Sequence, residues 1–150
     1  ENLDICERIE GKFHRLQREY PDFNFSLDNF YTLLSLWDGI SRLKYERESR
    51  GTGTMNFINA FFHFGDYSDE QKEYNPVLAI YSGNTYLKCD NRYRPTVIDT
   101  FNVLPLNGKN DVNLPPEETH LMKLRTKFPG TLISIRIFLN RNHIQRKIKK

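Results

Sequence analysis

The residues best suited to chemistry form a short segment with two glycines, Ser49-Arg50-Gly51-Thr52-Gly53-Thr54-Met55, directly before a predicted helix. Two glycines separated by one residue allow the backbone to approach a ligand closely. The first turn of the following helix has free N–H groups at the positive end of the helix dipole, which favours an anion. The side chains of Arg50, Thr52 and Thr54 add further donors. The segment therefore predicts a phosphate site, with a plain loop hinge as the alternative.

Two better-known glycine motifs do not fit this segment. A Walker loop ends in Gly-Lys-Ser/Thr, and that ending is absent here. A dinucleotide fingerprint needs a strand leading into the loop and a third glycine after it, and the sequence predicts neither.

The first half of the chain is predicted to be helical. Apolar residues recur at helical spacing in three segments, which are 3–20, 27–38 and 54–64. Ser26 is a suitable N-cap for the second helix, and Gly39 is a suitable stop. Residues 40–53, charged and then punctuated by glycine, have the composition of a lid loop between the second and third helices.

The second half is predicted to form strands, which are 77–82, 85–89, 96–101 and 131–139. Gly83-Asn84 predicts a tight hairpin turn between the first two strands. Residues 102–118 carry three Pro and four Asn, which predicts a long surface loop. Helices followed by strands favour an α+β fold, with helices packed on one face of a mixed or antiparallel sheet.

The charge is concentrated at the C-terminus. The chain has a net charge of +3, and its last ten residues hold five basic and no acidic side chains. Without them 17 basic and 19 acidic residues remain, a balance of −2, so binding of nucleic acid over the whole surface is not favoured. We expect one domain over 1–140 and a basic tail over 141–150.

Cysteine and histidine do not show metal-binding spacing. Cys6 and Cys89 are too few for a disulfide framework, and we expect both to be reduced thiols, buried or half-buried, in a cytoplasmic protein. No metal site is assigned to the four histidines, which are His14, His63, His120 and His143. No apolar run is long enough for a membrane helix, and no membrane partner is expected.

The order of the motifs resembles the C-terminal half of the ATP-binding domain of the GHKL superfamily (gyrase, heat-shock chaperone, histidine kinase, MutL). Residues 38–42 and 49–54 resemble its ATP lid and second glycine box. Residues 78–83 match a strand of the form apolar-Ile-x-Ser-Gly, and residues 129–137 match a final strand opened by Gly-Thr. The resemblance covers about residues 38–139 and implies part of a Bergerat-type sandwich.

The resemblance implies that the chain binds ATP with Mg²⁺. Backbone amides of the lid and of the helix start would contact the phosphates, with the Arg50 side chain near them. Thr131 matches the family threonine that reaches the adenine through water. The implied nucleotide-binding residues are Arg50, Gly51, Thr52, Gly53, Thr54, Met55 and Thr131. ATP binding would move the lid and so bias a partner surface or a homodimer interface.

Two family motifs are not found in this chain. The family's Mg²⁺-binding Asn and its adenine-reading Asp-x-Gly-x-Gly segment precede the matched region. Asp28-Asn29 and Asp38-Gly39 look similar, but only eight residues separate Asn29 from Asp38, which leaves no room for the intervening strand. We assign neither pair, assign no catalytic residue, and expect the Mg²⁺ ligands to lie outside this chain.

A second interpretation is an interaction module without nucleotide chemistry. Tyr81, Tyr86 and Tyr93 alternate with three basic residues, which are Lys88, Arg92 and Arg94. This pattern is typical of single-stranded nucleic-acid binding or, alternatively, of a solvated strand edge. The tail is a second candidate contact for nucleic acid or for an acidic protein partner.

Overall fold

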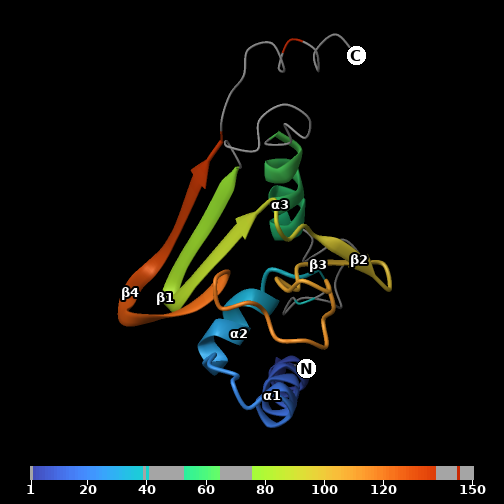
Figure 1. The fold of residues 1–150 in the computed structure, drawn as a ribbon, viewed down its shortest axis with the longest axis vertical. Coiled ribbons are helices and arrows are strands. Elements are labelled where there is room, and N and C mark those ends of the chain that lie inside the picture. The colour runs from blue at the N-terminus through green and yellow to red at the C-terminus, as the bar shows by residue number, and fades with distance from the viewer. Residues whose placement is uncertain (1, 39, 41–52, 65–75, 138–144, 146–150) are drawn as a thin grey trace.

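The computed structural model describes residues 2–38, 40, 53–64, 76–137 and 145 (Figure 1). Its helices are α1 (Asn2–Glu19), α2 (Leu27–Leu34) and α3 (Gly53–Phe64). Its strands are β1 (Val77–Asp90), β2 (Thr96–Ile98), β3 (Phe101–Val103) and β4 (Leu121–Arg136). The predicted α+β class is confirmed. In the described part, however, the strands form two antiparallel pairs, β1–β4 and β2–β3, in place of one larger sheet.

The three predicted helices are present, with their apolar stripes turned inward. Ile9, Phe13 and Leu16 of α1 are buried, as are Met55 and Ile58 of α3. Cys6, which the same stripe of α1 predicts to be at least half-buried, is exposed, while Cys89 is buried as expected. At that turn of α1 the neighbouring Ile5, and not Cys6, packs against the core.

The predicted N-cap of α2 is confirmed as a full capping box. The Ser26 hydroxyl accepts a hydrogen bond from the backbone N–H of Asn29 at 3.3 Å, and the Asn29 side chain accepts one from the Ser26 N–H at 2.8 Å. The helix ends at Leu34, four residues before the predicted end. The chain then turns, and Leu36 and Trp37 enter the core.

Strands β1 and β4 form one long ribbon that is bent in the middle. Both halves of β1 pair with β4: Leu78 lies opposite Ile135 on one side of the bend, and Leu87 lies opposite Leu121 on the other. The hairpin predicted at Gly83-Asn84 is therefore wrong. The chain does bend there, but the two predicted strands pair with a segment more than thirty residues further along and not with each other (Figure 1).

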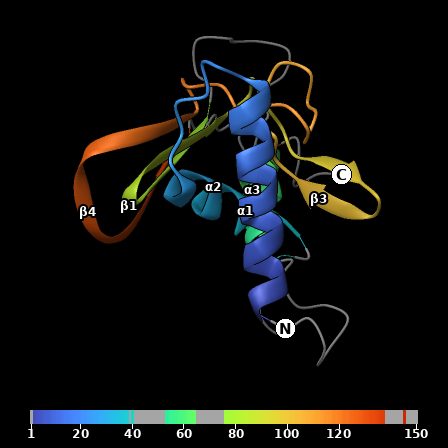
Figure 2. The same ribbon diagram turned by 90° about the horizontal axis from the view of Figure 1, so that it is seen from below.

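The bend in the ribbon has an inner and an outer strand. From Ser82 to Tyr86 the inner strand β1 advances four residues, whereas its partner β4 covers nine residues between Met122 and Thr131. Gly83 and Gly130 lie at the bend with φ of +53° and +118°, values that L side chains rarely adopt. The extra residues of β4 form a lobe on the outside of the bend, visible in Figure 2.

The segment 96–118 departs from both sequence expectations. The predicted strand 96–101 is a tight hairpin, β2–β3, whose two turn residues Asp99 and Thr100 have φ of 47° and 74°. Positive φ at both positions is the geometry of the turn that matches the twist of paired strands. The following segment is not a surface loop throughout, because Leu104 and Leu106 are fully buried.

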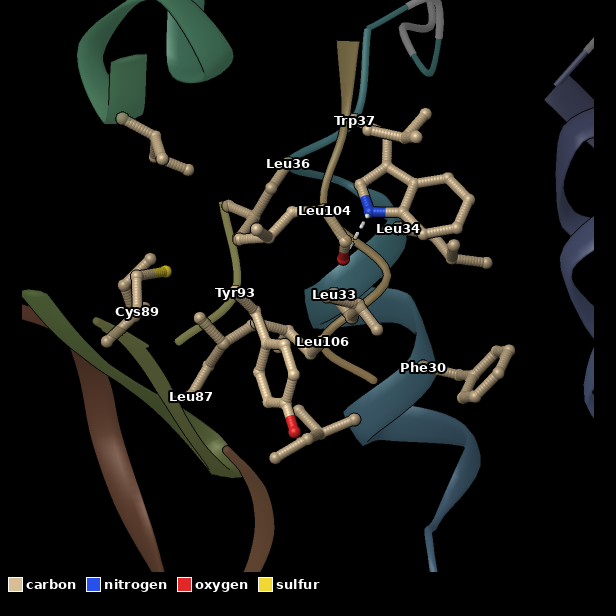
Figure 3. Close-up of a cluster of buried hydrophobic side chains, with 14 of the residues drawn as sticks. Phe30, Leu33, Leu34, Leu36, Trp37, Leu87, Cys89, Tyr93, Leu104 and Leu106 are labelled. Atoms are coloured by element: carbon tan, nitrogen blue, oxygen red, sulfur yellow. Dashed lines mark hydrogen bonds between the residues drawn. The ribbon is translucent and has the colours of Figure 1, made fainter. Parts of the chain in front are cut away.

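One hydrophobic core contains side chains from all three helices and from β1, β3 and β4. Figure 3 shows the part in which α2 and the turns after it meet β1 and the segment after β3. There the Trp37 indole N–H donates a hydrogen bond to the Leu104 carbonyl at 3.2 Å. This bond satisfies the only polar atom of the buried ring and fixes the chain just before the predicted lid.

Candidate functional site

The start of α3 is the described part of the predicted phosphate site. Gly53, the first helical residue, and Thr54 are both exposed, and a Cβ added at Gly53 would meet nothing within 4 Å. The first turn holds no acidic residue. Because the first N–H groups of a helix have no partner within the helix, this turn can donate hydrogen bonds to an anion.

Met55 differs from its two neighbours because its side chain has no exposed surface. It anchors the first turn of α3 in the core, and only its backbone is placed to meet a ligand. Arg50, Gly51 and Thr52, the other predicted members of the site, lie outside the described residues.

Thr131 follows the bend glycine of β4 and lies opposite Ser82 of β1. The two hydroxyl oxygens are 3.1 Å apart and share a hydrogen bond. The two motif segments 78–83 and 129–137 therefore lie side by side in one ribbon. Within the described residues, Thr131 makes this side-chain hydrogen bond to Ser82 and none to Gly53, Thr54 or Met55.

Asp38 stands just before the predicted lid, and sequence reasoning assigned it no role. Its carboxylate accepts hydrogen bonds from the Asn102 backbone N–H at 3.0 Å and from the Asn102 side chain at 2.7 Å. The Asp38 N–H in turn donates to the Asn102 carbonyl at 3.0 Å. The second carboxylate oxygen is buried and has no hydrogen-bond partner among the described residues. Asp38 thus fixes the end of the α2 region against β3, and no sequence pattern links it to Asn102.

A second polar cluster, also missed by sequence reasoning, joins the end of β1 to the start of β4. His120 is only 2 % exposed, and its two ring nitrogens lie 3.1 Å from Asp90 and 2.8 Å from the Thr119 hydroxyl. Burial alone would raise the pKa of Asp90. The Lys88 ammonium at 2.7 Å, the Arg92 N–H and His120 outweigh it, so the pKa is lowered.

A hydroxyl, an imidazole and a carboxylate in a row are the parts of a hydrolase triad. Here the carboxylate is already neutralised by Lys88, the ring is covered, and the hydroxyl belongs to the residue next to the histidine. We interpret the Asp90–His120 cluster as a structural clamp.

Part of the predicted Tyr/Lys/Arg face is buried or paired with acidic side chains. Tyr93 is 5 % exposed, and its ring packs edge-on against His120 at 4.7 Å between centroids. Lys88 is paired with Asp90, and Arg92 is paired with Glu117 at 3.3 Å. A buried ring cannot stack on a base, and paired cations add little attraction for a polyanion.

Among the described residues, no group of three or more His, Cys, Asp or Glu side chains could hold a metal ion. No helix in the same part of the chain is long and apolar enough to cross a membrane. No protein-family model matches the chain, and no curated protein or solved structure is detectably similar to it.

Proposed function

We propose that the chain binds ATP as part of a GHKL-type domain, with the glycine segment 50–55 contacting the phosphates. The observation that carries the proposal is the start of α3, where Gly53 and Thr54 are exposed and a Cβ added at Gly53 would meet no described atom within 4 Å. The pairing of segments 78–83 and 129–137 adds support, because it joins two of the four motifs that carry the resemblance.

In this proposal each described residue has a limited task. The N–H groups of Gly53, Thr54 and Met55 donate to phosphate oxygens, and the buried Met55 side chain keeps the helix start in place. The Trp37 and Asp38 contacts fix the other end of the lid. Mg²⁺ bound with the nucleotide would neutralise phosphate charge, and its protein ligands would come from outside this chain.

A matched pair of glycine variants tests the proposal. Gly53→Val places a branched side chain over the helix start, and Gly11→Val places the same side chain at another exposed helical position with open space. The thermal shift with an ATP analogue and Mg²⁺ is measured on this chain and on a form extended at its N-terminus. We expect stabilisation of the extended form, retained in Gly11→Val and lost in Gly53→Val. A nucleotide shift in neither form, or equal shifts in both variants, would contradict the proposal.

A specific surface favours nucleic-acid binding as the second candidate function. Three exposed cations lie on the β4 lobe or directly before it, and β4 contains no acidic residue; they are Lys123, Arg125 and Lys127. Near the same bend the rings of Tyr81 and Tyr86 are 4.9 Å apart, and Phe128 lies 6.2 Å from Tyr81. Exposed cations and aromatic rings are the residue types that bind a single-stranded nucleic acid, and both occur near this bend.

Salt dependence separates this candidate from nucleotide binding. Oligonucleotide affinity would fall with salt, and replacing the three lobe cations by Ala would reduce the slope of log K against log salt by roughly 2. Replacing three exposed cations elsewhere, Arg8, Arg18 and Lys109, is the matched control and should change the slope much less. Equal losses in the two triple variants would argue against a site on the lobe.

A further inference from the structure

The side of the ribbon that carries β4 leaves apolar residues uncovered. Residues directly opposite each other in an antiparallel pair point to the same face. Ile133 and Ile135 therefore share a face with their partners Ile80 and Leu78. The β1 pair is 5 % and 0 % exposed, whereas Ile133 and Ile135 are 50 % and 43 % exposed. The apolar face thus extends from the buried residues of β1 onto half-exposed residues of β4 within the part of the chain that the structure describes.

The same strand also has an open backbone edge. Within the described residues β4 pairs with β1 alone, so the other edge of residues 131–136 presents unpaired N–H and C=O groups. In Figure 1 the first half of β1 lies between residues 131–136 of β4 and α3, which makes this part of β4 the outer strand. A two-stranded ribbon is only marginally stable in water, and an open apolar edge is a template for a further strand.

We propose that a second copy of this chain pairs with this edge, antiparallel, about a two-fold axis through Ser134. A two-fold axis perpendicular to the sheet leaves each residue on the same face in both copies. Because paired residues must point to the same face, odd-numbered residues of one copy pair with odd-numbered residues of the other, and even-numbered with even-numbered. Centring the axis on Ser134 uses the whole segment 131–137. It places Ile133 opposite Ile135 of the partner subunit, and Thr131 opposite Ile137 of the partner subunit.

This register suits both faces of the strand. On the face shared with Leu78 and Ile80, the two copies of Ile133 and Ile135 form one apolar patch. On the other face Leu132 lies opposite the partner's Arg136, and Ser134 lies opposite its own copy, so no two like charges are directly opposed. The product is a four-stranded sheet in the order β1–β4–β4–β1. The dimer does not depend on nucleotide binding.

Cross-linking at two positions of β4 tests the register. Ser134→Cys would place two thiols across the axis, with Cβ atoms about 5 Å apart. Thr131→Cys, equally exposed on the same strand, would leave its thiols roughly 20 Å apart. Both variants carry Cys6→Ser, because Cys6 is exposed, and Cys89 stays because it is buried. We expect mild oxidation or a short bis-maleimide to link Ser134→Cys into a dimer at least tenfold faster.

Opposite charges at Leu132 give a second test that needs no cross-link. Leu132 is 47 % exposed, so Leu132→Glu and Leu132→Lys should both fold. In the proposed dimer Glu would meet Arg136 of the partner subunit twice, and Lys would be repelled twice. We expect the dimer Kd of the Lys variant, from sedimentation at low salt, to exceed that of the Glu variant by roughly tenfold.

Three results would overturn the proposal. The first is a wild-type chain that stays monomeric by light scattering at about 200 µM, a concentration at which a weak specific dimer should still be visible. The second is cross-linking of Thr131→Cys as fast as that of Ser134→Cys, which would indicate unregistered association. The third is an equal Kd for the two Leu132 variants.

Discussion

The two arms of the bent ribbon use the same two strands in different surroundings. We call residues 77–82 with 131–136 the upper arm and residues 85–87 with 121–123 the lower arm. In the lower arm Thr85, Leu87 and Leu121 have no exposed surface, and Asn29 of α2 bonds to Thr85 at 2.9 Å. In the upper arm the buried residues are Leu78, Ala79 and Ile80 of β1, whereas Leu132, Ile133 and Ile135 of β4 are 43–50 % exposed.

The difference follows from what each arm packs against. The lower arm has α2 on it, and the Asn29 amide also donates to the carbonyls of Asn84 and Met122, one on each strand. One buried side chain therefore fixes both strands at the bend. Among the described residues no helix side chain bonds to the upper arm of β4 in this way, and Ile133 and Ile135 stay half-exposed, so we infer that this arm is suited to association and the lower arm to positioning.

The largest effect expected from this comparison is a contrast between two apolar truncations. Leu87→Ala in the lower arm should lower the free energy of unfolding by about 3–5 kcal/mol, because it leaves a cavity in a filled core. Ile135→Ala in the upper arm should lower it by about 1 kcal/mol, because that side chain is already 43 % exposed. Urea unfolding at sub-micromolar concentration measures both in the monomer. Similar losses would mean that the two arms are equally covered.

Asn29 provides the next largest effect. Asn29→Ala removes the side-chain half of the α2 capping box, because the Ser26 N–H loses its acceptor, and it leaves the Thr85 hydroxyl and two carbonyls at the bend without this partner. We expect a loss of about 2–3 kcal/mol in unfolding free energy. Asn113→Ala is the matched control, because Asn113 is exposed and accepts one hydrogen bond from Arg15. The control should lose less than about 0.5 kcal/mol.

The helices could be predicted from the sequence because their signals are local. The spacing of apolar residues predicted the bounds of α1 and α3 to within a residue or two, and the N-cap residue Ser26 predicted where α2 begins. The ribbon could not be predicted in the same way. Gly83-Asn84 has the composition of a hairpin turn, and only the distant segment 121–136 decides that both flanking strands pair elsewhere.

The candidate site shows the same limit. The helix start at Gly53–Met55 could be predicted, because a glycine segment before an amphipathic helix is a local pattern. The Asp38–Asn102 and Asp90–His120 contacts could not, because their members are 64 and 30 residues apart. Likewise, Leu106 and Thr100 adopt positive φ, although neither residue type favours that conformation, so the sequence could not predict it.

Substitution of the bend glycine tests whether the two arms are separated by a fixed corner. Gly83→Ala forces a side chain into φ +53° although open space surrounds it, so strain alone should lower the unfolding free energy by about 1–2 kcal/mol. Gly11→Ala, in a helix with equal space, should instead raise it by up to about 1 kcal/mol. If Gly83→Ala were neutral, the bend would not depend on glycine.

The contrast between covered and exposed side chains also applies to lysines. Here we expect the smallest effect, which is a change in the pH dependence of stability. Burial, followed by repulsion from Arg15, lowers the pKa of Lys12 from 10.5 to about 8, and its ammonium lies 4.8 Å from the Trp37 ring centre. The unfolded chain therefore binds the Lys12 proton more tightly than the folded chain between about pH 8 and 10.5. Stability should rise with pH across that window as the folded-state penalty disappears.

Lys12→Met should remove this rise, which we expect to be about 1 kcal/mol because the side chain is only partly covered. Lys127→Met, on the exposed β4 lobe, is the matched control and should leave the pH dependence of unfolding unchanged. Chemical unfolding of the three proteins at pH 7.5 and 10 measures the difference, and tyrosine and cysteine titration cancels because all three share it. A parallel rise in Lys12→Met would show that Lys12 carries no burial penalty, and that covered and exposed lysines are alike in this protein.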